Sequence, residues 1–508
     1  MKNTKKRLLT SVLSIALAAT LSTAMSSCTG GAENQDGTKA EVPELTAPED
    51  TRSLDGALSL IDDAQNLLDT AFSSVEVTPA EQFTVELDKD GNSTLTGYNG
   101  EDIVVVIPDE INGAPVTEIA PEAFKGLTAL RAVCIPDSVT AIGAGAFKGC
   151  NSLTTLKLPF NAAIYEIEKA VAAETSVEDG NTSETVTVDG YFGYIFGALS
   201  YKINAASVPA NLKTVIFTGA AEEIPDYAFY DCNDIIQISL PDGIEKIGDF
   251  AFSGCSSLAM IGIGDSAKEI GSYAFDNCSS LLDITLPATV ESIGLGAFQG
   301  CGSLVTMTLP FVGGSHDENL YFGYIFGAES YTLAPGFFPA SLIRVTVLEG
   351  CTSIGDNAFN NCRTVREIVL PEGITKIGYR AFRNCVLLRS ISLPSSTKSI
   401  GDSAFLGCVS LNGVSLGDGL EDMGVQIFMH CISLESISLP ESITSVPAST
   451  FDGCKALESI EWSEDIESIG KNAFRGCTSL TTFPDIADHV VIEEGNEPFG
   501  RVMKAYDQ

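Results

Sequence analysis

The chain has 508 residues, enough for several domains or for one long repeat array. Its 29 Lys and Arg stand against 67 Asp and Glu, and the net charge of -38 argues against nucleic-acid partners, because phosphate binding needs clustered basic side chains. The three histidines are too few to favour zinc-hydrolase or histidine-based acid/base chemistry.

The N-terminus has the pattern of a signal peptide over residues 1–27. A basic start precedes a run at residues 8–25 that is apolar apart from Ser and Thr, and Cys28 follows. The cysteine at this point resembles a bacterial lipobox, although Met25 stands where that motif usually carries Leu. The resemblance implies lipid attachment at Cys28 and a membrane partner through that anchor. An ordinary secretory signal with an incidental cysteine is the alternative.

Three segments precede the main body of the chain. Residues 28–51 are acidic and rich in Gly, Pro and Thr, which predicts a flexible tether. Apolar residues at helical spacing predict a helix over 52–80, serving as a cap or as a stalk. Asp90-Gly91 predicts a hairpin cap over 81–102. A calcium loop starting at Asp88 is the weaker reading of that turn, because Asn99 stands where such a loop needs Glu.

From residue 103 to residue 484 the chain repeats with a period of 23 residues. Each unit reads L-x-x-I-x-L-P, then I-G, then A-F-x-x-C. The phenylalanines that mark the period are Phe124, Phe147, Phe229, Phe252, Phe275, Phe298, Phe359, Phe382, Phe405, Phe428, Phe451 and Phe474. Cysteines follow three residues later, among them Cys255, Cys278, Cys385 and Cys408. We interpret these two rows as the structural core.

The unit predicts a coil with one strand, because Ile391 and Leu393 alternate with polar neighbours and Pro394 then ends the strand. The A-F-x-x-C segment predicts a short helical or 3-10 turn that places its Phe at the centre of the coil. One coil cannot bury both sides of that ring, so stacked coils are required. The two longer gaps predict insertions near 160–208 and 311–338. The whole body predicts about fourteen coils, closed by a C-terminal cap at 485–508.

This pattern resembles the leucine-rich repeat class, specifically the BspA-like family of bacterial surface proteins. The opening segment, with Val105, Ile107 and Asn112-Gly113, resembles the usual first repeat of that family. The resemblance implies a solenoid of short parallel strands stacked in one sheet. It also implies adhesion to host or matrix proteins, or a related surface interaction.

The 14 cysteines of an exported chain could form disulfides, but the spacing favours buried free thiols. Neighbouring cysteines one coil apart have nearly parallel Cβ directions, which is poor disulfide geometry, and such a column cannot converge on a metal ion. We therefore expect no metal site and no cofactor. Cys134 and Cys351 lie outside the row, and their state is left open.

Two surfaces are candidate ligand contacts. The motif Y-F-G-Y-I-F-G-A occurs at residues 191–198 and again at 321–328, and its Tyr191, Tyr194, Tyr321 and Tyr324 could anchor a ligand. The alternative is that these aromatics fill the core of a divergent repeat, which we favour for Phe192, Ile195 and Phe196. The second surface is the outward side of the sheet, which carries Thr285, Thr308, Ser392, Ser415 and Ser438.

The sequence predicts a lipid-anchored cell-surface protein that binds an extracellular protein or glycan noncovalently. It contains no recognisable catalytic motif, so no catalytic residue is assigned and an enzyme is not expected. A structural envelope spacer without a specific ligand is the first alternative. The second is a hydrolase on the 160–208 insertion that uses paired carboxylates, drawn from Glu166, Glu168, Glu174, Glu178 and Asp179.

Overall fold

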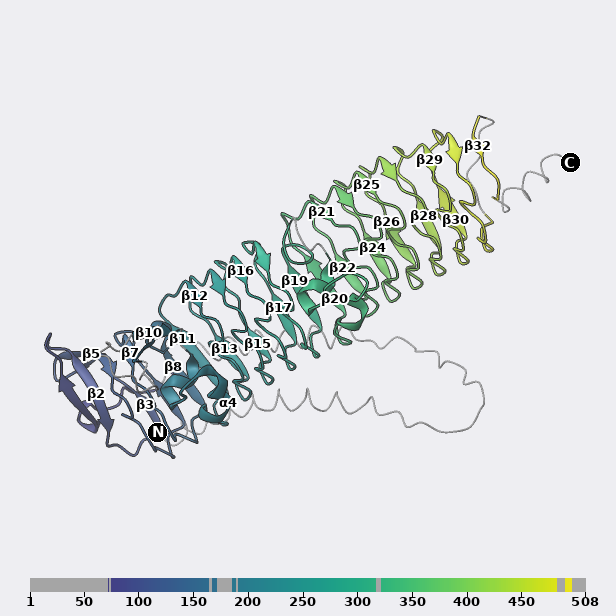
Figure 1. Cartoon of the computed structure of the whole chain (residues 1–508). Helices are drawn as coiled ribbons and strands as arrows, with labels where there is room; N and C mark the ends of the chain where they lie inside the picture. Colours follow the sequence, from purple (N-terminus) through teal and green to yellow (C-terminus); the bar gives the residue numbers. More distant parts are fainter. Residues whose placement is uncertain are drawn as a thin grey trace, which may run out of the picture.

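The computed structural model describes residues 72, 75–163, 167–170, 185–188, 191–316, 321–481 and 489–495. They form an elongated solenoid, with β2 (Ser93–Tyr98) and β3 (Val104–Val106) at one end and β30 (Ser459–Glu461) and β32 (Val491–Ile492) at the other (Figure 1). The predicted signal peptide, Cys28, the tether at 28–51 and most of the 485–508 tail lie outside the described residues.

One side of the solenoid, which we call the sheet face, consists of fourteen parallel strands in sheets of six, six and two. The fourteen strands agree with the predicted count of about fourteen coils. With the turns at the two ends included, the solenoid has about sixteen turns. The strands are β3 (Val104–Val106), β6 (Ala132–Cys134), β8 (Thr155–Pro159), β11 (Thr214–Thr218), β13 (Gln237–Ser239), β15 (Met260–Ile261), β17 (Asp283–Thr285), β19 (Thr306–Leu309), β20 (Arg344–Val347), β22 (Glu367–Val369), β24 (Ser390–Ser392), β26 (Gly413–Ser415), β28 (Ser436–Ser438) and β30 (Ser459–Glu461).

A second side, the narrow face, is formed by shorter parallel strands, most of them only two residues long. They are β5 (Ala114–Ile119), β7 (Ala141–Ile142), β12 (Glu223–Ile224), β14 (Lys246–Ile247), β16 (Glu269–Ile270), β18 (Ser292–Ile293), β21 (Ser353–Ile354), β23 (Lys376–Ile377), β25 (Ser399–Ile400), β27 (Asp422–Met423), β29 (Ser445–Val446), β31 (Ser468–Ile469) and β32 (Val491–Ile492). The sequence does not predict this second row, because a two-residue strand is too short to show alternation.

The A-F-x-x-C segments form the third side, the turn face. Each is a single turn closed by a hydrogen bond such as Cys385 N–H to the Phe382 carbonyl (3.1 Å). It does not continue into a helix, because the residue before the segment, such as Arg380, and the residue before its cysteine, such as Asn384, have φ near +57°. The 3-10 helices of the solenoid body, η3 (Phe192–Phe196), η4 (Tyr201–Ile203), η5 (Phe322–Phe326) and η6 (Ala334–Gly336), lie in the insertions.

The phenylalanines stack into one column along the axis. Phe382 and Phe405 have ring centroids 5.0 Å apart, and Phe405 and Phe428 have centroids 5.4 Å apart, with planes within 10° of parallel. All three rings are fully buried. Each coil thus covers one face of its neighbour's ring, which confirms the stacking argument from the sequence.

Glycine follows the narrow-face strand because neighbouring coils approach closely there. A Cβ on Gly401 would lie 2.7 Å from the backbone nitrogen of Tyr379 in the preceding coil. The reason for this glycine is therefore backbone contact between coils. The two neighbouring repeats place Gly378 and Gly424 at the same point.

The N-terminal end is covered by β1 (Phe83–Leu87) and β2 (Ser93–Tyr98), an antiparallel hairpin within the range predicted for it. A short η2 (Ala80–Gln82) precedes it, and β4 (Glu110–Ile111) pairs with β5. The helix predicted over 52–80 is wrong for residues 75–79, which are not helical. Thr78 instead pairs with β3, because its backbone N–H donates to the Val106 carbonyl (3.0 Å). The rest of that predicted helix lies outside the described residues.

The first insertion contains α3 (Phe160–Ala163), an antiparallel pair β9 (Ile167–Ala170) and β10 (Thr185–Val188), and α4 (Asn204–Ser207). Both insertions return to the repeat in register. Phe147 N–H donates to the Ile195 carbonyl (2.9 Å), and Phe192 N–H donates to the Ala228 carbonyl (2.8 Å). These are the bonds that ordinary coils make, such as Phe382 N–H to the Ala404 carbonyl (2.8 Å), so the column continues through the insertion.

Candidate ligand-binding surface

The cysteine row is a structural element. All 13 described cysteines are free, which confirms the prediction of free thiols and settles Cys134 and Cys351 in the same way. Nine of the row thiols donate to the carbonyl of a phenylalanine one coil earlier, as Cys408 Sγ does to the Phe382 carbonyl (3.1 Å). Burial raises the pKa of the Cys150 thiol to about 11. Among the described residues, no cluster of His, Cys, Asp and Glu could hold a metal ion.

The tyrosines of the repeated motif belong largely to the framework. Tyr191 is 4% exposed, and its hydroxyl donates to the Ala198 carbonyl (3.1 Å). This placement is a correction, since Tyr191 has almost no surface to offer a ligand. Tyr321 is half-buried and its hydroxyl makes the same bond to Ala328 (3.1 Å), while Tyr194 and Tyr324 pack against the core. Phe192, Ile195 and Phe196 are buried, as the core interpretation predicts.

The outward row of the sheet face is accessible and flat. Thr285, Ser392, Ser415 and Ser438 are exposed, and Thr308 is half-buried. The parallel register sets Thr285 beside Thr308 and Ser392 beside Ser415, while Ser438 lies beside a glutamate. Small hydroxyl groups in this arrangement can form hydrogen bonds but provide little apolar contact area.

The turn face carries an aromatic surface that sequence reasoning missed. We call Tyr201, Tyr227, Phe250 and Tyr273 the aromatic ladder; all four are half-exposed. Successive ring centroids lie 4.3, 5.1 and 5.0 Å apart, and the planes are within 22° of parallel. The signal was available, because an aromatic residue stands two places before Phe229, Phe252 and Phe275 at the 23-residue spacing.

The ladder holds its backbone in an unfavourable conformation. Tyr227, Phe250 and Tyr273 have φ between +55° and +59°, a region that bulky residues rarely adopt and that costs roughly 1–2 kcal/mol each. Other coils place Asn357 or Gly296 at this position, where such residues fit readily, and some place smaller or flexible polar residues such as Ser403 and Gln426 there with the same positive φ. Ring stacking offsets only part of the cost, about 0.5–1.5 kcal/mol per pair.

Carboxylates border the ladder and also shape it. Asp226 Oδ1 accepts a hydrogen bond from Asp249 N–H, and Asp249 Oδ1 accepts one from Ser272 N–H, each at 2.6 Å. These bonds connect consecutive coils beside the rings. Burial, followed by the charges of nearby groups including both aspartates, raises the pKa of Tyr227.

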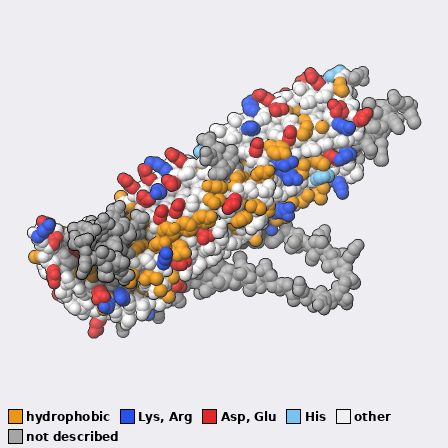
Figure 2. All heavy atoms as spheres, in the orientation of Figure 1, with side chains coloured by type: hydrophobic (Ala, Val, Ile, Leu, Met, Phe, Trp, Pro, Cys, Tyr) orange, Lys and Arg blue, Asp and Glu red, His pale blue; other side chains and the backbone are white. Residues whose placement is uncertain are grey.

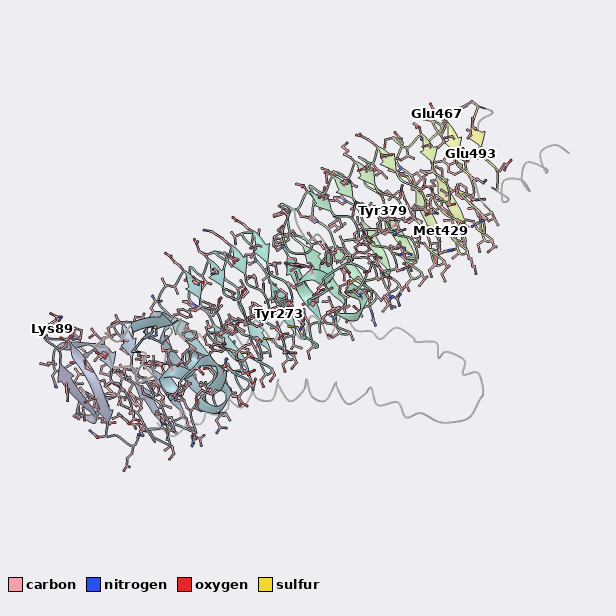
Figure 3. The ribbon with its side chains drawn as sticks, in the orientation of Figure 1. Lys89, Tyr273, Tyr379, Met429, Glu467 and Glu493 are labelled. Atoms are coloured by element: carbon pink, nitrogen blue, oxygen red, sulfur yellow. The ribbon has the colours of Figure 1, made fainter. Side chains whose placement is uncertain are left out.

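Figure 2 shows hydrophobic side chains gathered in a stripe along the turn face. Tyr273, Tyr379 and Met429, labelled in Figure 3, lie along it. The stripe crosses many coils, so it could contact an extended partner along the solenoid.

The hydrolase alternative stays a prediction. The carboxylates considered for a hydrolase lie in a part of the insertion whose side chains the structure does not describe. Within the described part of the chain, no helix is long and apolar enough to span a bilayer.

A sequence profile described as "BspA type Leucine rich repeat region (6 copies)" matches residues 110–215, 204–312, 336–424 and 375–494. Among solved structures, the chain is similar to a leucine-rich repeat protein from Bacteroides ovatus, with 24% identity over 82% of this chain and 99% of that one and a TM-score of 0.34. It is also similar to a leucine rich cell surface protein from Faecalibacterium prausnitzii, with 20% identity, coverages of 84% and 97%, and a TM-score of 0.26. The pneumococcal vaccine antigen PcpA gives 20% identity, coverages of 83% and 94%, and a TM-score of 0.25. No curated protein matches the sequence.

Proposed function

The chain belongs to the BspA-type leucine-rich repeat family, and from this we propose that it is an exported, lipid-anchored surface protein that binds an extracellular protein or glycan noncovalently. The signal-like start and Cys28 support export and anchoring. The acidic composition continues to disfavour nucleic acid as the partner.

The aromatic ladder carries this proposal. A surface position that keeps strained aromatic residues in three consecutive coils, where Asn or Gly would fit without strain, is better explained by binding than by folding. Tyrosine provides a large rigid contact area at low entropic cost, and the hydroxyls of Tyr227 and Tyr273 can also form hydrogen bonds. Many copies on one cell surface would strengthen a modest affinity per molecule.

The test replaces Tyr227, Phe250 and Tyr273 together by Asn, the residue that other coils already carry at this position. We expect the thermal stability to change little, because relief of backbone strain offsets the lost stacking. Binding to an array of matrix proteins and glycans should fall at least tenfold. An alanine set at Ser392, Ser415 and Ser438 on the sheet face serves as the matched control and should retain binding.

If the wild-type chain binds nothing on such an array and the Asn variant has no phenotype, the spacer alternative replaces this proposal. Anchoring is tested separately by Cys28→Ala. The variant should lose metabolic labelling with radioactive palmitate and appear in the culture medium or another soluble fraction, whereas a chain that remains membrane-bound and unlabelled in both forms contradicts lipidation.

A further inference from the structure

One segment of this acidic chain is basic. Residues 344–398 contain eight Lys and Arg and only four Asp and Glu, so they carry a net charge of +4 within a chain of -38. Five of the basic residues lie on the turn face or where the chain leaves it towards the sheet face, on two adjacent coils. We call them the arginine patch: Arg363, Arg366, Arg380, Arg383 and Arg389.

Backbone hydrogen bonds place these residues together. Arg389 N–H donates to the Arg366 carbonyl across the two coils (3.3 Å), and Arg383 N–H donates to the Arg380 carbonyl within one turn (3.2 Å). Asn361 N–H donates to the Arg383 carbonyl (2.7 Å), which brings the turn of Arg363 beside that of Arg383. Figure 2 shows Lys and Arg side chains beside the hydrophobic stripe, near the position that Figure 3 labels Tyr379.

No carboxylate forms an ion pair with the arginine patch among the described residues. None of its five guanidinium groups forms an ion pair or a hydrogen bond there, and the Nε atoms of Arg380 and Arg383 are buried without a partner. The nearby carboxylates of Asp356 and Asp402 make hydrogen bonds to backbone N–H groups and form no ion pair with these arginines. Asp356 Oδ1 accepts from Tyr379 N–H (2.8 Å), and Asp402 Oδ1 accepts from Val425 N–H (2.9 Å). A bound anion would satisfy donors that the fold leaves unpaired.

Exposed apolar side chains within the patch indicate which kind of anion fits. Tyr379 is 38% exposed with the Arg380 guanidinium 4.5 Å from its ring centroid, and Leu387 is 41% exposed between Arg383 and Arg389 in sequence. Guanidinium groups match the planar carboxylate, and Leu387 offers apolar area that a sulfated glycan cannot cover. An acidic polypeptide segment with apolar side chains would pair its carboxylates with the guanidinium groups and cover Leu387 with its apolar side chains.

We infer that the arginine patch binds an acidic polypeptide segment that also carries apolar side chains. This inference rests on the proposed function, since it names the chemistry of a ligand for the same turn face. The ligand's carboxylates pair with Arg380 and Arg383, and its apolar side chains cover Leu387 and the edge of Tyr379.

The test uses substitutions that other coils already carry at the same positions. Gln426 corresponds to Arg380 and Gln299 corresponds to Arg383, so R380Q/R383Q should fold normally. The matched control, K376S/K398T, also removes two positive charges from the same segment but on the narrow-face side, where Ser399 and Thr375 are the corresponding residues. The probes for the full-length chain are a glutamate–tyrosine copolymer, poly-L-glutamate and heparin, measured by fluorescence polarisation.

We expect the copolymer to bind more tightly than poly-L-glutamate, and R380Q/R383Q to weaken its binding at least tenfold while K376S/K398T changes it less than twofold. Equal losses in both variants would show non-specific charge attraction and overturn the inference. Patch-dependent binding of heparin that is tighter than that of the copolymer would assign an acidic glycan instead. Self-association that requires the same arginines would assign a second copy of the chain.

The Asn variant of the aromatic ladder separates this inference from the proposed function. It should keep copolymer binding, since the ladder lies several coils away from the patch. The arginine-patch inference alone would be refuted by two results together. The chain would fail to bind the copolymer, and its array ligands would be lost in the ladder variant but retained by R380Q/R383Q.

Discussion

Cysteine suits the position three residues after each core phenylalanine because it is small, apolar and still a weak donor. The Phe382 carbonyl accepts from Cys385 N–H in its own turn and from Cys408 Sγ in the next coil, both at 3.1 Å. Both lone pairs of a buried carbonyl are thereby used. Alanine would leave a gap and lose the second bond, and a larger apolar residue would lose the donor and crowd the column.

The buried thiols predict alkaline sensitivity. Burial raises the pKa of Cys255, Cys278 and Cys301 above the ordinary value near 9. Below pH 9 the thiols are protonated in both the folded and the unfolded chain, and the stability is complete. Above pH 9 the unfolded chain loses these protons while the folded chain retains them, so the free energy of unfolding falls by up to about 1.4 kcal/mol per pH unit for each buried thiol.

Urea midpoints at pH 8, 9 and 10 measure this effect. Tyrosines with raised pKa values begin to contribute near pH 10, where the unfolded phenols ionise, but they contribute equally to the wild type and to a cysteine variant. A variant with Ser at Cys255, Cys278 and Cys301 should lose stability more slowly between pH 9 and pH 10 than the wild type. Identical slopes for the two proteins would show that the thiols do not cause the sensitivity.

The repeated motif of the two insertions has the same fold although different side chains pack beside it. In the first, the Asn204 Oδ1 accepts from Gly193 N–H (3.1 Å), while its buried Nδ2 has no partner. In the second, Ala334 stands at the corresponding position beside Gly323. The fold of this element therefore does not depend on the asparagine, which is only half satisfied.

Asn204→Ala should accordingly change the free energy of unfolding by less than about 1 kcal/mol. Gly193→Ala should be far more damaging, because a Cβ there would collide with Asn204 Oδ1 and with the Ala198 side chain. Hydrogen exchange of residues 191–208 distinguishes the two variants. Equal protection in both would contradict the steric argument.

At this scale the sequence predicts what depends on strict spacing. The Phe and Cys rows, the coil count and the buried Phe192, Ile195 and Phe196 follow from the 23-residue period. The narrow face does not, since it rests on two-residue strands. The aromatic ladder has the 23-residue spacing in the sequence, but the stacking of its half-exposed rings depends on backbone positions with positive φ. The sequence leaves Tyr191 open between ligand contact and core, because its hydroxyl bonds to a carbonyl seven residues away, a contact that spacing cannot reveal.

The whole molecule is a one-dimensional stack, so a defect in one coil should separate the stabilities of its two sides. In such a solenoid each coil contacts only its neighbours, and stability is close to a sum of coil and interface terms. From Phe359 to Phe474 the stacked phenylalanines are part of every interface between coils. The single tryptophan, Trp462, lies near the C-terminal end with its ring 6.1 Å from Phe474, so it reports on that end alone.

Phe405→Ala should therefore uncouple the C-terminal coils. Removing a fully buried ring that stacks on both neighbours costs about 3–5 kcal/mol. We expect the Trp462 fluorescence transition in guanidinium chloride to move to lower denaturant than the main circular dichroism transition, because the coils beyond Phe405 lose their connection to the rest. Phe147→Ala, the matched change near the N-terminal end, should leave the Trp462 midpoint unchanged. If both variants shift the fluorescence and dichroism midpoints together by the same amount, the solenoid unfolds as one cooperative unit. The C-terminal coils would then not unfold separately from the rest.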